Sequence, residues 1–159
     1  MIASFERLNS LRVSDAMTPH VVTLTANSTM SEAADLLCEH RITGAPVVDE
    51  HGECVGVLSG TDFIHCKAEE LDGNNVGHVL SATHPYGLYR IDEVRHDLVR
   101  RHMTPAVQTI GKDTSLLQAA RCMCCEHIHR LVVIDGQARP IGILTSLDLV
   151  ATLIAVVEE

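Results

Sequence analysis

The feature that most constrains the fold of this chain is an internal repeat. The segment from Val13 to Ile64 aligns with the segment from Val99 to Val150 at a constant offset of 86 residues, without a gap. Identical residues recur in this register at Met17, Thr18, Pro19, Val21, Thr23, Ala33, Ala34, Cys38, Ile42, Val47, Asp49, Gly56, Leu58 and Asp62. The chain of 159 residues is therefore predicted to form one compact molecule of two similar halves, with no room for a separate catalytic domain.

Each copy is predicted to fold as a strand, a helix, two strands and a second helix. The first helix is expected to open at Ser28 or Thr114, and the second directly after Ser59 or Thr145. The expected core positions of the first helix are Ala33, Ala34 and Leu37 in one copy and Ala119, Ala120 and Met123 in the other. Strands are expected at residues 20–24, 45–49, 54–59, 106–110, 131–135 and 140–145. With only 3% aromatic residues, this order predicts an α/β fold with an aliphatic core.

The repeat also predicts how the chain is divided. We expect a first motif with its N-terminal segment over residues 1–66, a connecting segment over 67–98, and a second motif with a C-terminal helix over 99–159. The connection contains GNNVG, a proline and both tyrosines, which are typical of turns and loops. Some helix is expected between Asp92 and Arg101.

Charge and composition argue against several functions. A formal net charge of −9 and few aromatic residues argue against nucleic-acid binding, which needs clustered basic residues or stacking platforms. The N-terminus lacks the apolar stretch of a signal peptide, and the apolar run Leu153–Val157 is too short to span a membrane. The sequence therefore predicts a cytoplasmic protein without membrane contact, whose six cysteines are reduced thiols.

A carboxylate follows the last predicted strand of each copy. Asp62 and Asp148 lie three residues after Ser59 and Thr145, at the predicted start of a helix. A carboxylate in this position can accept hydrogen bonds from both hydroxyls of a ribose, and helix N-terminal amides can hold phosphate oxygens. The same spacing fits a capping box, which stabilises a helix start without any ligand. Both interpretations stay open at this point.

Three segments of each copy together resemble the CBS-domain family, whose tandem pair is called a Bateman module. They are VSDAMTP and VRRHMTP before the first strand, HRITGAPVVD and EHIHRLVVID at the second strand, and GVLSGTD and GILTSLD before the last helix. The family usually has proline at the position of Pro46, whereas the second copy has Val132 there. The resemblance implies a standalone pair of CBS motifs, each β-α-β-β-α, packed about a pseudo-twofold axis.

The resemblance further implies two clefts for adenosyl ligands, each lined by both copies. The cleft expected to bind a nucleotide best takes Ser59, Thr61, Asp62, Thr104, Thr109, Ile128, His129 and Arg130. The second cleft takes Thr18, Thr23, Ile42, Thr43, Gly44, Thr145 and Asp148. AMP, ADP or ATP is the expected regulatory ligand, with NAD-type molecules and S-adenosylmethionine as further candidates; no other cofactor is required. A homodimer and a regulated effector protein are also expected.

The two expected clefts differ in charge. In similar modules a pair such as His129-Arg130 reaches the nucleotide phosphates, for which arginine supplies charge-assisted donors. The first copy has the uncharged pair Thr43-Gly44 at the equivalent position, and the second copy has Leu147 where the first has Thr61. The cleft with the basic pair is therefore the expected phosphate site, the alternative being a solvated surface pair.

A metal or thiol site is one alternative function. The run from Cys122 to His129 contains Cys122, Cys124, Cys125, His127 and His129, which are side-chain types that bind zinc. On the predicted helix, however, Cys124 points away from the other two cysteines and shares the register of Cys38. We therefore expect no metal, and buried or partly buried cysteines.

Catalysis and ligand-free docking are two more functions that a chain of this kind could have. The sequence contains no nucleophile elbow, Walker loop, GxGxxG turn or HExxH helix, so no enzyme is expected, and His84-Pro85-Tyr86 is expected to form a turn. A dimerisation or partner-docking module would use apolar positions of the last helix, such as Leu149, Leu153 and Ile154, although these positions also suit a core.

Overall fold

The computed structural model describes residues 2–70, 97–105 and 107–158 of the chain. The elements of the first repeat are β2 (Leu24–Thr25), α2 (Met30–Glu39), β3 (Gly44–Val48), β4 (Cys54–Ser59) and α3 (Gly60–Glu70). Those of the second repeat are β6 (Thr109–Gly111), α6 (Leu116–Glu126), β7 (Arg130–Ile134), β8 (Pro140–Thr145) and α7 (Ser146–Glu158). The predicted order of strand, helix, strand, strand and helix is confirmed in both copies.

Further elements precede each copy. They are α1 (Ile2–Ser10), the 3-10 turn η1 (Val13–Asp15) and β1 (Thr18–Pro19) before the first, and α5 (Val99–His102) and β5 (Thr104–Pro105) before the second. Of the strand expected at residues 20–24, only Leu24 lies in a strand, β2, and His20 has a positive φ of 58°, outside the extended region. The helix expected between Asp92 and Arg101 is described only from residue 97 onward, where α5 lies.

The sheets exchange one strand between the copies. Their strand orders are β1-β8-β7-β6 and β2-β3-β4-β5, so β1 joins the second copy's strands and β5 the first copy's. Two compact units result: the repeat-1 unit, Val22–Val107, and the repeat-2 unit, Met1–Val21 with Gln108–Glu159. The predicted motif boundaries follow the sequence repeat, whereas each of these units contains a segment from both copies of the repeat. The predicted boundaries therefore stay a prediction.

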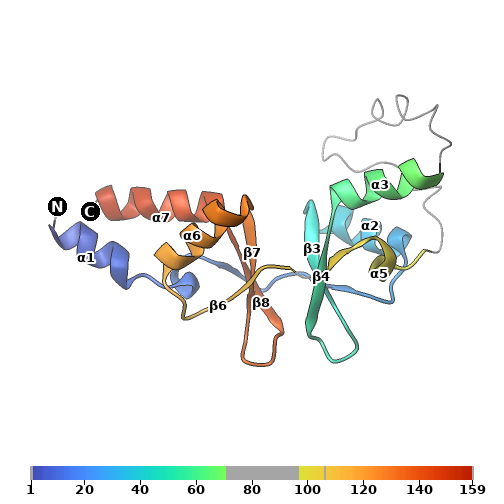
Figure 1. The fold of residues 1–159 in the computed structure, drawn as a ribbon, viewed down its shortest axis with the longest axis horizontal. Helices are drawn as coiled ribbons and strands as arrows, with labels where there is room; N and C mark the ends of the chain where they lie inside the picture. Colours follow the sequence, from blue (N-terminus) through green and yellow to red (C-terminus); the bar gives the residue numbers. More distant parts are fainter. Residues whose placement is uncertain (1, 71–96, 106, 159) are drawn as a thin grey trace. The chain divides into compact units, whose positions relative to one another are not determined.

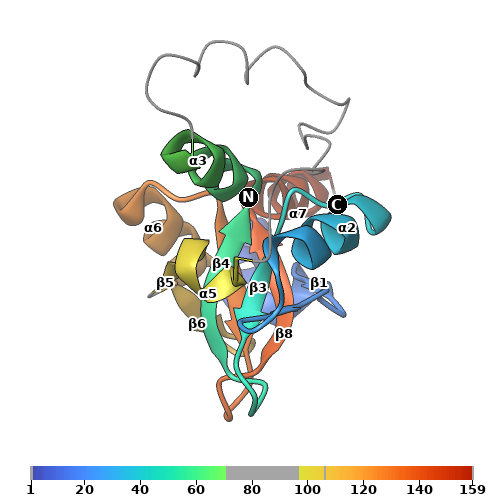
Figure 2. The ribbon, with the colours of Figure 1, turned by 90° about the vertical axis from the view of Figure 1, so that its right-hand side faces the viewer.

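In each unit the helices lie on one face of the sheet. Helices α1, α6 and α7 lie beside β7 and β8 in the repeat-2 unit (Figure 1), and α2, α3 and α5 cover β3 and β4 in the repeat-1 unit (Figure 2). The cores between them contain Leu24, Met30, Ala33, Ala34, Leu37, Ala45, Val47, Leu58, Phe63 and Val99 in one unit, and Val13, Leu116, Ala119, Met123, Leu131, Val133 and Leu144 in the other. The predicted core positions of the first helices are confirmed, except that Ala120 is only half-buried.

Two lead segments, residues 11–19 and 97–105, attach to the opposite copy. In the repeat-2 unit the amide of Val13 donates to the carbonyl of Thr114, and the amide of Leu116 donates to the carbonyl of Leu11, each at 2.9 Å. The Val13 side chain is fully buried in the core of that unit. The N-terminal segment therefore packs into the second copy, which lies about a hundred residues further along the chain.

The second lead segment makes the equivalent bonds in the repeat-1 unit. The amide of Val99 donates to the carbonyl of Ser28 at 2.9 Å, and the amide of Met30 donates to the carbonyl of Asp97 at 2.8 Å. Val99 is fully buried, like Val13 in the other unit. Each copy thus completes the core of the other.

The first helix of each copy starts one residue later than predicted. The Thr29 hydroxyl accepts from the amide of Glu32 at 3.2 Å, and the Glu32 carboxylate accepts from the amide of Thr29 at 2.8 Å, which is a capping box. Ser28 instead forms a hydrogen bond with the side chain of Thr25. In the second copy Ser115 caps the helix in place of Thr114.

Glycines allow the exchanged strands to approach their partners. A Cβ atom at Gly142 would lie 2.9 Å from the carbonyl oxygen of Thr18 and 2.8 Å from the sulfur of Met17. Gly56 is enclosed in the same way by Thr104 and Met103. No larger residue fits at either contact without moving the exchanged strand.

We therefore predict that Gly142→Ala lowers the free energy of unfolding by about 1–3 kcal/mol, because the added methyl group overpacks the contact with β1. The matched control is Gly136→Ala, at a turn where a Cβ meets nothing within 4 Å; it should change stability by less than about 0.5 kcal/mol. Urea denaturation measures both. Equal effects of the two substitutions would contradict close packing of β1 on β8.

Candidate functional site

The first candidate site residues lie where β4 passes directly into α3. Ser59 ends the strand, and the Oδ2 atom of Asp62 accepts from the Ser59 amide at 2.6 Å and from the Ser59 hydroxyl at 2.9 Å. Both residues are half-buried. Within the described residues, the other carboxylate oxygen, Oδ1, has no hydrogen-bond partner. The capping interaction predicted as the alternative is present, and it leaves one acceptor oxygen available.

The repeat-2 unit has the same arrangement between β8 and α7. The Oδ2 atom of Asp148 accepts from the amide and from the hydroxyl of Thr145, both at 2.7 Å. The Thr145 hydroxyl accepts in turn from the amide of Asp148 at 3.2 Å. Two bonds to one oxygen fix the direction of each carboxylate, so the second oxygen is held in a fixed position as well.

The start of the neighbouring strand lies beside each of these helix starts. In the repeat-1 unit Gly44 is paired with Ser59 across the sheet, and the amide of Gly60 donates to the carbonyl of Thr43 at 2.9 Å. Ile42, just before, is half-buried against the core. The residues expected in two different clefts therefore share one end of this sheet.

In the repeat-2 unit the corresponding strand start carries the basic pair. Arg130 is paired with Thr145 across the sheet, and the amide of Ser146 donates to the carbonyl of His129 at 3.0 Å. The side chains of His129 and Arg130 are exposed, whereas Ile128 packs against the core. Both basic side chains thus start beside the hydroxyl and carboxylate of this unit.

The remaining expected residues lie on the short strands or next to them. Thr104 is paired with Val57 and Thr18 with Ile143. Thr109 opens β6 and is exposed, and Thr23 is half-buried just before β2. Thr61 is exposed in the first turn of α3.

Each expected cleft draws on both units. The repeat-1 unit holds Ser59, Thr61, Asp62 and Thr104 of the first set and Thr23, Ile42, Thr43 and Gly44 of the second. The repeat-2 unit holds Thr109, Ile128, His129 and Arg130 of the first set and Thr18, Thr145 and Asp148 of the second. The structure places the residues of one unit near one another. That the residues of both units together line a common cleft stays a prediction.

One carboxylate that recurs in the repeat is not at this end of the sheet. The Oδ1 atom of Asp49 accepts from the amides of His51 and Glu53, each at 2.9 Å, in the turn after β3. The hydrogen bond from Glu53 is the main cause that holds the pKa of Asp49 below its usual range. Asp135 has the same role in the second copy. These aspartates shape turns, a role that was not predicted for them from the sequence.

The cysteines differ from expectation. Cys122 is half-buried against the core, but Cys38, Cys124 and Cys125 are exposed, so the prediction of buried or partly buried thiols is wrong for these three. Desolvation by burial raises the pKa of the Cys54 thiol.

In the parts of the chain that the structure describes, no three His, Cys, Asp or Glu side chains gather as metal ligands. The cluster at His84 lies outside the described residues.

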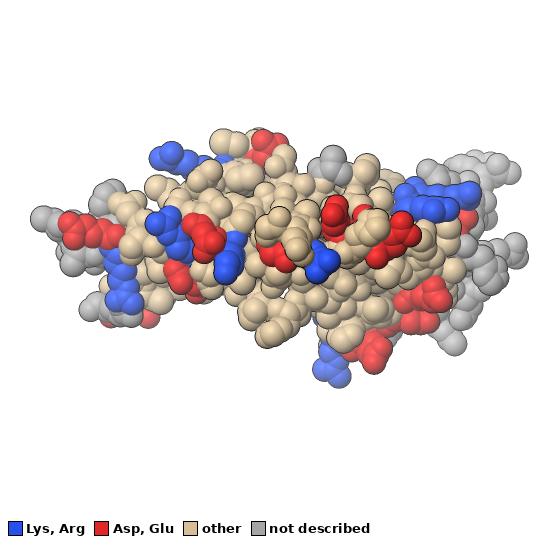
Figure 3. Space-filling view, turned by 90° about the horizontal axis from the view of Figure 1, so that it is seen from below, with Lys and Arg blue, Asp and Glu red and all other residues tan. Residues whose placement is uncertain are grey.

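Surface charge shows no extended basic patch on the face that Figure 3 draws. Lys and Arg side chains are interspersed there with Asp and Glu and with much uncharged surface. None of the helices in the described part of the chain has the length and apolar character needed to cross a bilayer.

Several known proteins are similar to this chain. CBSX2 of Arabidopsis thaliana is 30% identical over 157 residues, and its crystal structure matches 94% of this chain and 99% of that one with a TM-score of 0.73. CBSX2 has also been crystallised in complex with AMP, at 27% identity and a TM-score of 0.69. The CBS domain pair of protein MJ0100, in complex with 5′-methylthioadenosine and S-adenosylmethionine, matches at 25% identity, a TM-score of 0.67, and 89% and 98% of the two chains.

Three of these relatives are longer than this chain. It spans 38% of a Methanocaldococcus jannaschii protein that is 31% identical, and 55% and 65% of the chloroplastic proteins CBSX1 and CBSX2. The similarity nevertheless covers both copies, because the model of the CBS domain matches residues 13–69 and again residues 94–155. The two repeats, their exchanged strands and their matching helix starts are those of a pair of CBS motifs, and the chain belongs to the CBS domain family.

Proposed function

We propose that this chain is a regulatory module that senses an adenosyl ligand and is not an enzyme. The observation that carries this proposal is the hydroxyl and carboxylate pair at the start of α3 and of α7. One oxygen of Asp62 is fixed by two hydrogen bonds, and the other is unpartnered among the described residues. An acceptor oriented in this way can bind the two hydroxyls of a ribose, which every adenosyl ligand carries. The complexes of CBSX2 and of MJ0100 support this ligand class.

The preferred ligand is an adenine nucleotide, AMP, ADP or ATP, in the cleft that joins Asp62 to His129 and Arg130. The support is the difference in charge between the strand starts: β7 begins at an exposed arginine, whereas β3 begins at Gly44, which has no room for a side chain. In this cleft Asp62 takes the ribose, and the guanidinium with the amides at the start of α3 takes the phosphates. The other cleft, with Asp148 and Thr43, suits a less charged adenosyl ligand.

Two further parts of the proposal concern the setting of the module. We propose that two copies associate and that the pair acts on an effector protein when ligand binds, since the resemblance to the family implies a dimer. We also place the protein in the cytoplasm, although the similar proteins CBSX1 and CBSX2 are chloroplastic.

Two observations favour other functions. Exposed apolar residues on α7 favour a ligand-free docking module. The exposed thiols of Cys124 and Cys125 favour thiol sensing or metal binding. A ligand screen separates these possibilities from nucleotide sensing.

Thermal unfolding with AMP, ADP, ATP, NAD, S-adenosylmethionine, GTP and zinc should show stabilisation by adenine nucleotides. A ligand at about 100 times its Kd adds roughly 2.7 kcal/mol to the native state, which is a rise in Tm of about 5–10 °C for a chain of this size. GTP, which shares the ribose and phosphates but not the adenine, is the control. Absence of any shift with adenosyl compounds, together with stoichiometric zinc in the purified protein, would move the assignment to a metal site.

Asp62→Ala should weaken nucleotide binding by about 10–100-fold, because it removes a charged acceptor worth roughly 1.5–3 kcal/mol. It should also lower stability by about 1 kcal/mol as a helix cap is lost. The matched control is Glu32→Ala, which removes the capping carboxylate of α2 away from the expected cleft. Isothermal titration with AMP should find the control unchanged in Kd. If both variants bind equally well, Asp62 is only a cap.

Arg130→Gln should weaken ATP binding by about 10–100-fold and leave adenosine binding within about 2-fold, because only the phosphates meet the guanidinium. Arg121→Gln, at an exposed position of α6, is the control for the lost charge. Titration of ATP and adenosine into each variant gives the comparison. Equal phosphate-dependent binding in both clefts of the unaltered protein would contradict the assignment.

A further inference from the structure

Three of the six cysteines lie within four residues near the end of α6, and the proposed nucleotide site uses none of them. They are Cys122, Cys124 and Cys125. At the positions of the first and the last of these, the first repeat has Leu36 and Glu39. The equivalent helix of the first copy therefore forms without a thiol at either position, so the fold does not require the cysteines at 122 and 125.

Helix geometry pairs two of the three thiols. Cys122 and Cys125 lie about 60° apart around the axis of α6, because three residues make almost a full turn. Cys124 lies about 100° from Cys125 and about 160° from Cys122. The Cα atoms of Cys122 and Cys125 are then roughly 5 Å apart, which is within the range that a disulfide spans. We call these two residues the thiol pair.

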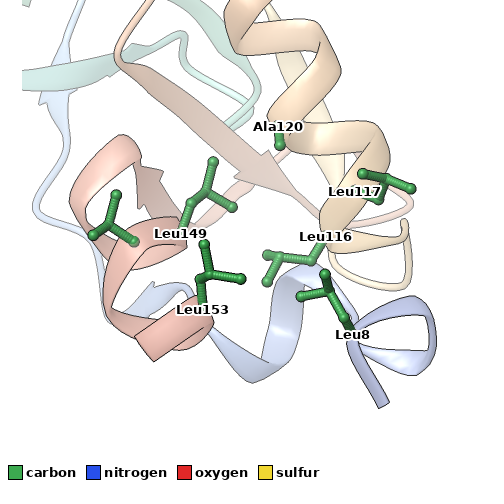
Figure 4. A pocket seen from close by; sticks show the side chains of 7 residues that line it. Leu8, Leu116, Leu117, Ala120, Leu149 and Leu153 are labelled. Atoms are coloured by element: carbon green, nitrogen blue, oxygen red, sulfur yellow. The ribbon is translucent and has the colours of Figure 1, made fainter. Parts of the chain in front are cut away.

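The thiol pair and Cys124 are on different flanks of α6. Leu116 and Ala120 of this helix face an apolar hollow that α1 and α7 complete (Figure 4). Cys124 lies four residues after Ala120, on the same side of the helix as that residue. The thiol pair is on the opposite flank, and neither of its residues lines the hollow.

The two thiols of the pair differ in exposure. Cys125 is exposed to solvent, whereas Cys122 is half-buried and packs against the core of the repeat-2 unit. Exchange with a disulfide in solution needs one accessible thiol that attacks and a second thiol within its reach. The exposed Cys125 suits the first role, and the neighbouring Cys122 suits the second.

The chain that leads into β7 is held from inside the thiol pair. The amide of His127 donates to the carbonyl of Met123, and so does the amide of Ile128, at 3.0 Å. His127 has a φ of 53°, in the left-handed region that residues with a Cβ atom seldom adopt. Met123 lies between the two cysteines in the sequence. A change in this last turn of α6 therefore changes the cap that sets the start of β7.

A disulfide within the pair would make such a change. The Cβ atoms of residues three apart in a helix lie about 5–6 Å apart, whereas a disulfide needs about 3.5–4.5 Å between them. Closing the bond therefore tightens the last turn of α6 by roughly 1 Å or more. Disulfides that are strained or exposed are also the ones that are readily reduced again, so the bond would be reversible.

We propose that the thiol pair is a site of reversible thiol–disulfide exchange with small-molecule disulfides. The Cys125 thiolate attacks one sulfur of the disulfide RSSR, so that a bond forms between these two sulfurs, the S–S bond of RSSR breaks and one RS⁻ leaves. The Cys122 thiolate then attacks the Sγ atom of Cys125 and releases the second RS⁻. The two leaving thiolates take up the two protons that the cysteines lose. The pair is oxidised by two electrons, and RSSR is reduced by two.

Oxidation of the pair also weakens the phosphate end of the proposed cleft; this part of the inference rests on the nucleotide site proposed above. The residues that follow the α6 cap are Ile128, His129 and Arg130. The carbonyl of His129 accepts from the amide of Ser146 at 3.0 Å, so the backbone of this strand start is tied to the start of α7. A change in the cap therefore changes the position of the basic pair on which phosphate binding depends.

The test is exchange of the full chain with oxidised glutathione, followed by blocking of free thiols and digestion with trypsin. Cleavage after Arg121 and Arg130 releases residues 122–130 as one peptide that contains all three cysteines. Mass spectrometry of the unaltered chain should find this peptide lighter by two hydrogen atoms, and dithiothreitol should restore them. Absence of a disulfide within the peptide would overturn the proposal.

Serine substitutions identify the partners. Cys124→Ser keeps the thiol pair and is the matched control; it should form the bond at a rate within about 2-fold of the unaltered chain. Adding Cys125→Ser should abolish the bond. Adding Cys122→Ser instead should leave at least about 10-fold more glutathione attached to Cys125 than in the control, because a linked thiol acts at an effective concentration in the millimolar range. Loss of the bond in Cys124→Ser alone would contradict the pairing.

Titration of ATP into the reduced and the oxidised Cys124→Ser chain tests the regulatory part. Oxidation should weaken ATP binding by about 10-fold, as expected when one charge-assisted contact is disturbed. The chain that also carries Cys125→Ser should bind ATP equally well before and after the same treatment. Equal ATP binding by the reduced and the oxidised control would overturn the regulation and leave the exchange site standing. A reduced chain that does not bind ATP would overturn the nucleotide site and with it the regulation, whereas the peptide measurement would still decide the exchange site.

Discussion

The rest of the structure depends on the pairing of each lead segment with the opposite copy. Val13 and Val99 are fully buried in cores whose other residues come from the other repeat. The hydrogen bonds that hold them are the same in both units, with the roles of the two copies interchanged. A buried amide without a partner costs free energy, so these bonds specify the exchange together with the apolar contacts. A single repeat would lack one strand of its sheet and one valine of its core.

Both units present the same polar groups at the end of their sheets. Because β4 and β8 lead directly into helices, Ser59 and Thr145 each place a hydroxyl beside a carboxylate that the helix start holds in a fixed direction. The neighbouring strand adds backbone carbonyls on one side and, in the repeat-2 unit alone, Arg130. The pair of hydroxyl and carboxylate therefore occurs in both units, whereas the basic residue at the start of the neighbouring strand occurs in only one. The two proposed clefts, each of which takes its carboxylate from one unit and its strand start from the other, therefore differ in charge and can differ in the ligand they accept.

Some local features of this molecule were predictable from the sequence, and its strand exchange, which is non-local, was not. The positions of Asp62 and Asp148 follow from a spacing of three residues at a helix start, which is a local pattern. The strand exchange is different, because the two-residue strands β1 and β5 have no periodicity of their own, and the repeat is equally compatible with each copy keeping its own lead segment. Cys38 and Cys124 were expected beside the core, but the buried stripe of each helix ends one residue earlier, at Leu37 and Met123. In the first copy the cap is Thr29 and not Ser28, whose hydroxyl is hydrogen-bonded to the Thr25 side chain.

The division of the two units along the chain has a consequence for the order in which they fold during synthesis. The repeat-1 unit is continuous, Val22–Val107, and all its strands are present once β5 has been made. The repeat-2 unit is split, and its first 21 residues leave the ribosome long before β8, the strand on which β1 pairs. Contacts that span most of a chain are slow to form, and an unpaired segment with an apolar residue such as Val13 is exposed to wrong partners in the meantime. The segment that contains β1 therefore has no partner strand until β8 has been made.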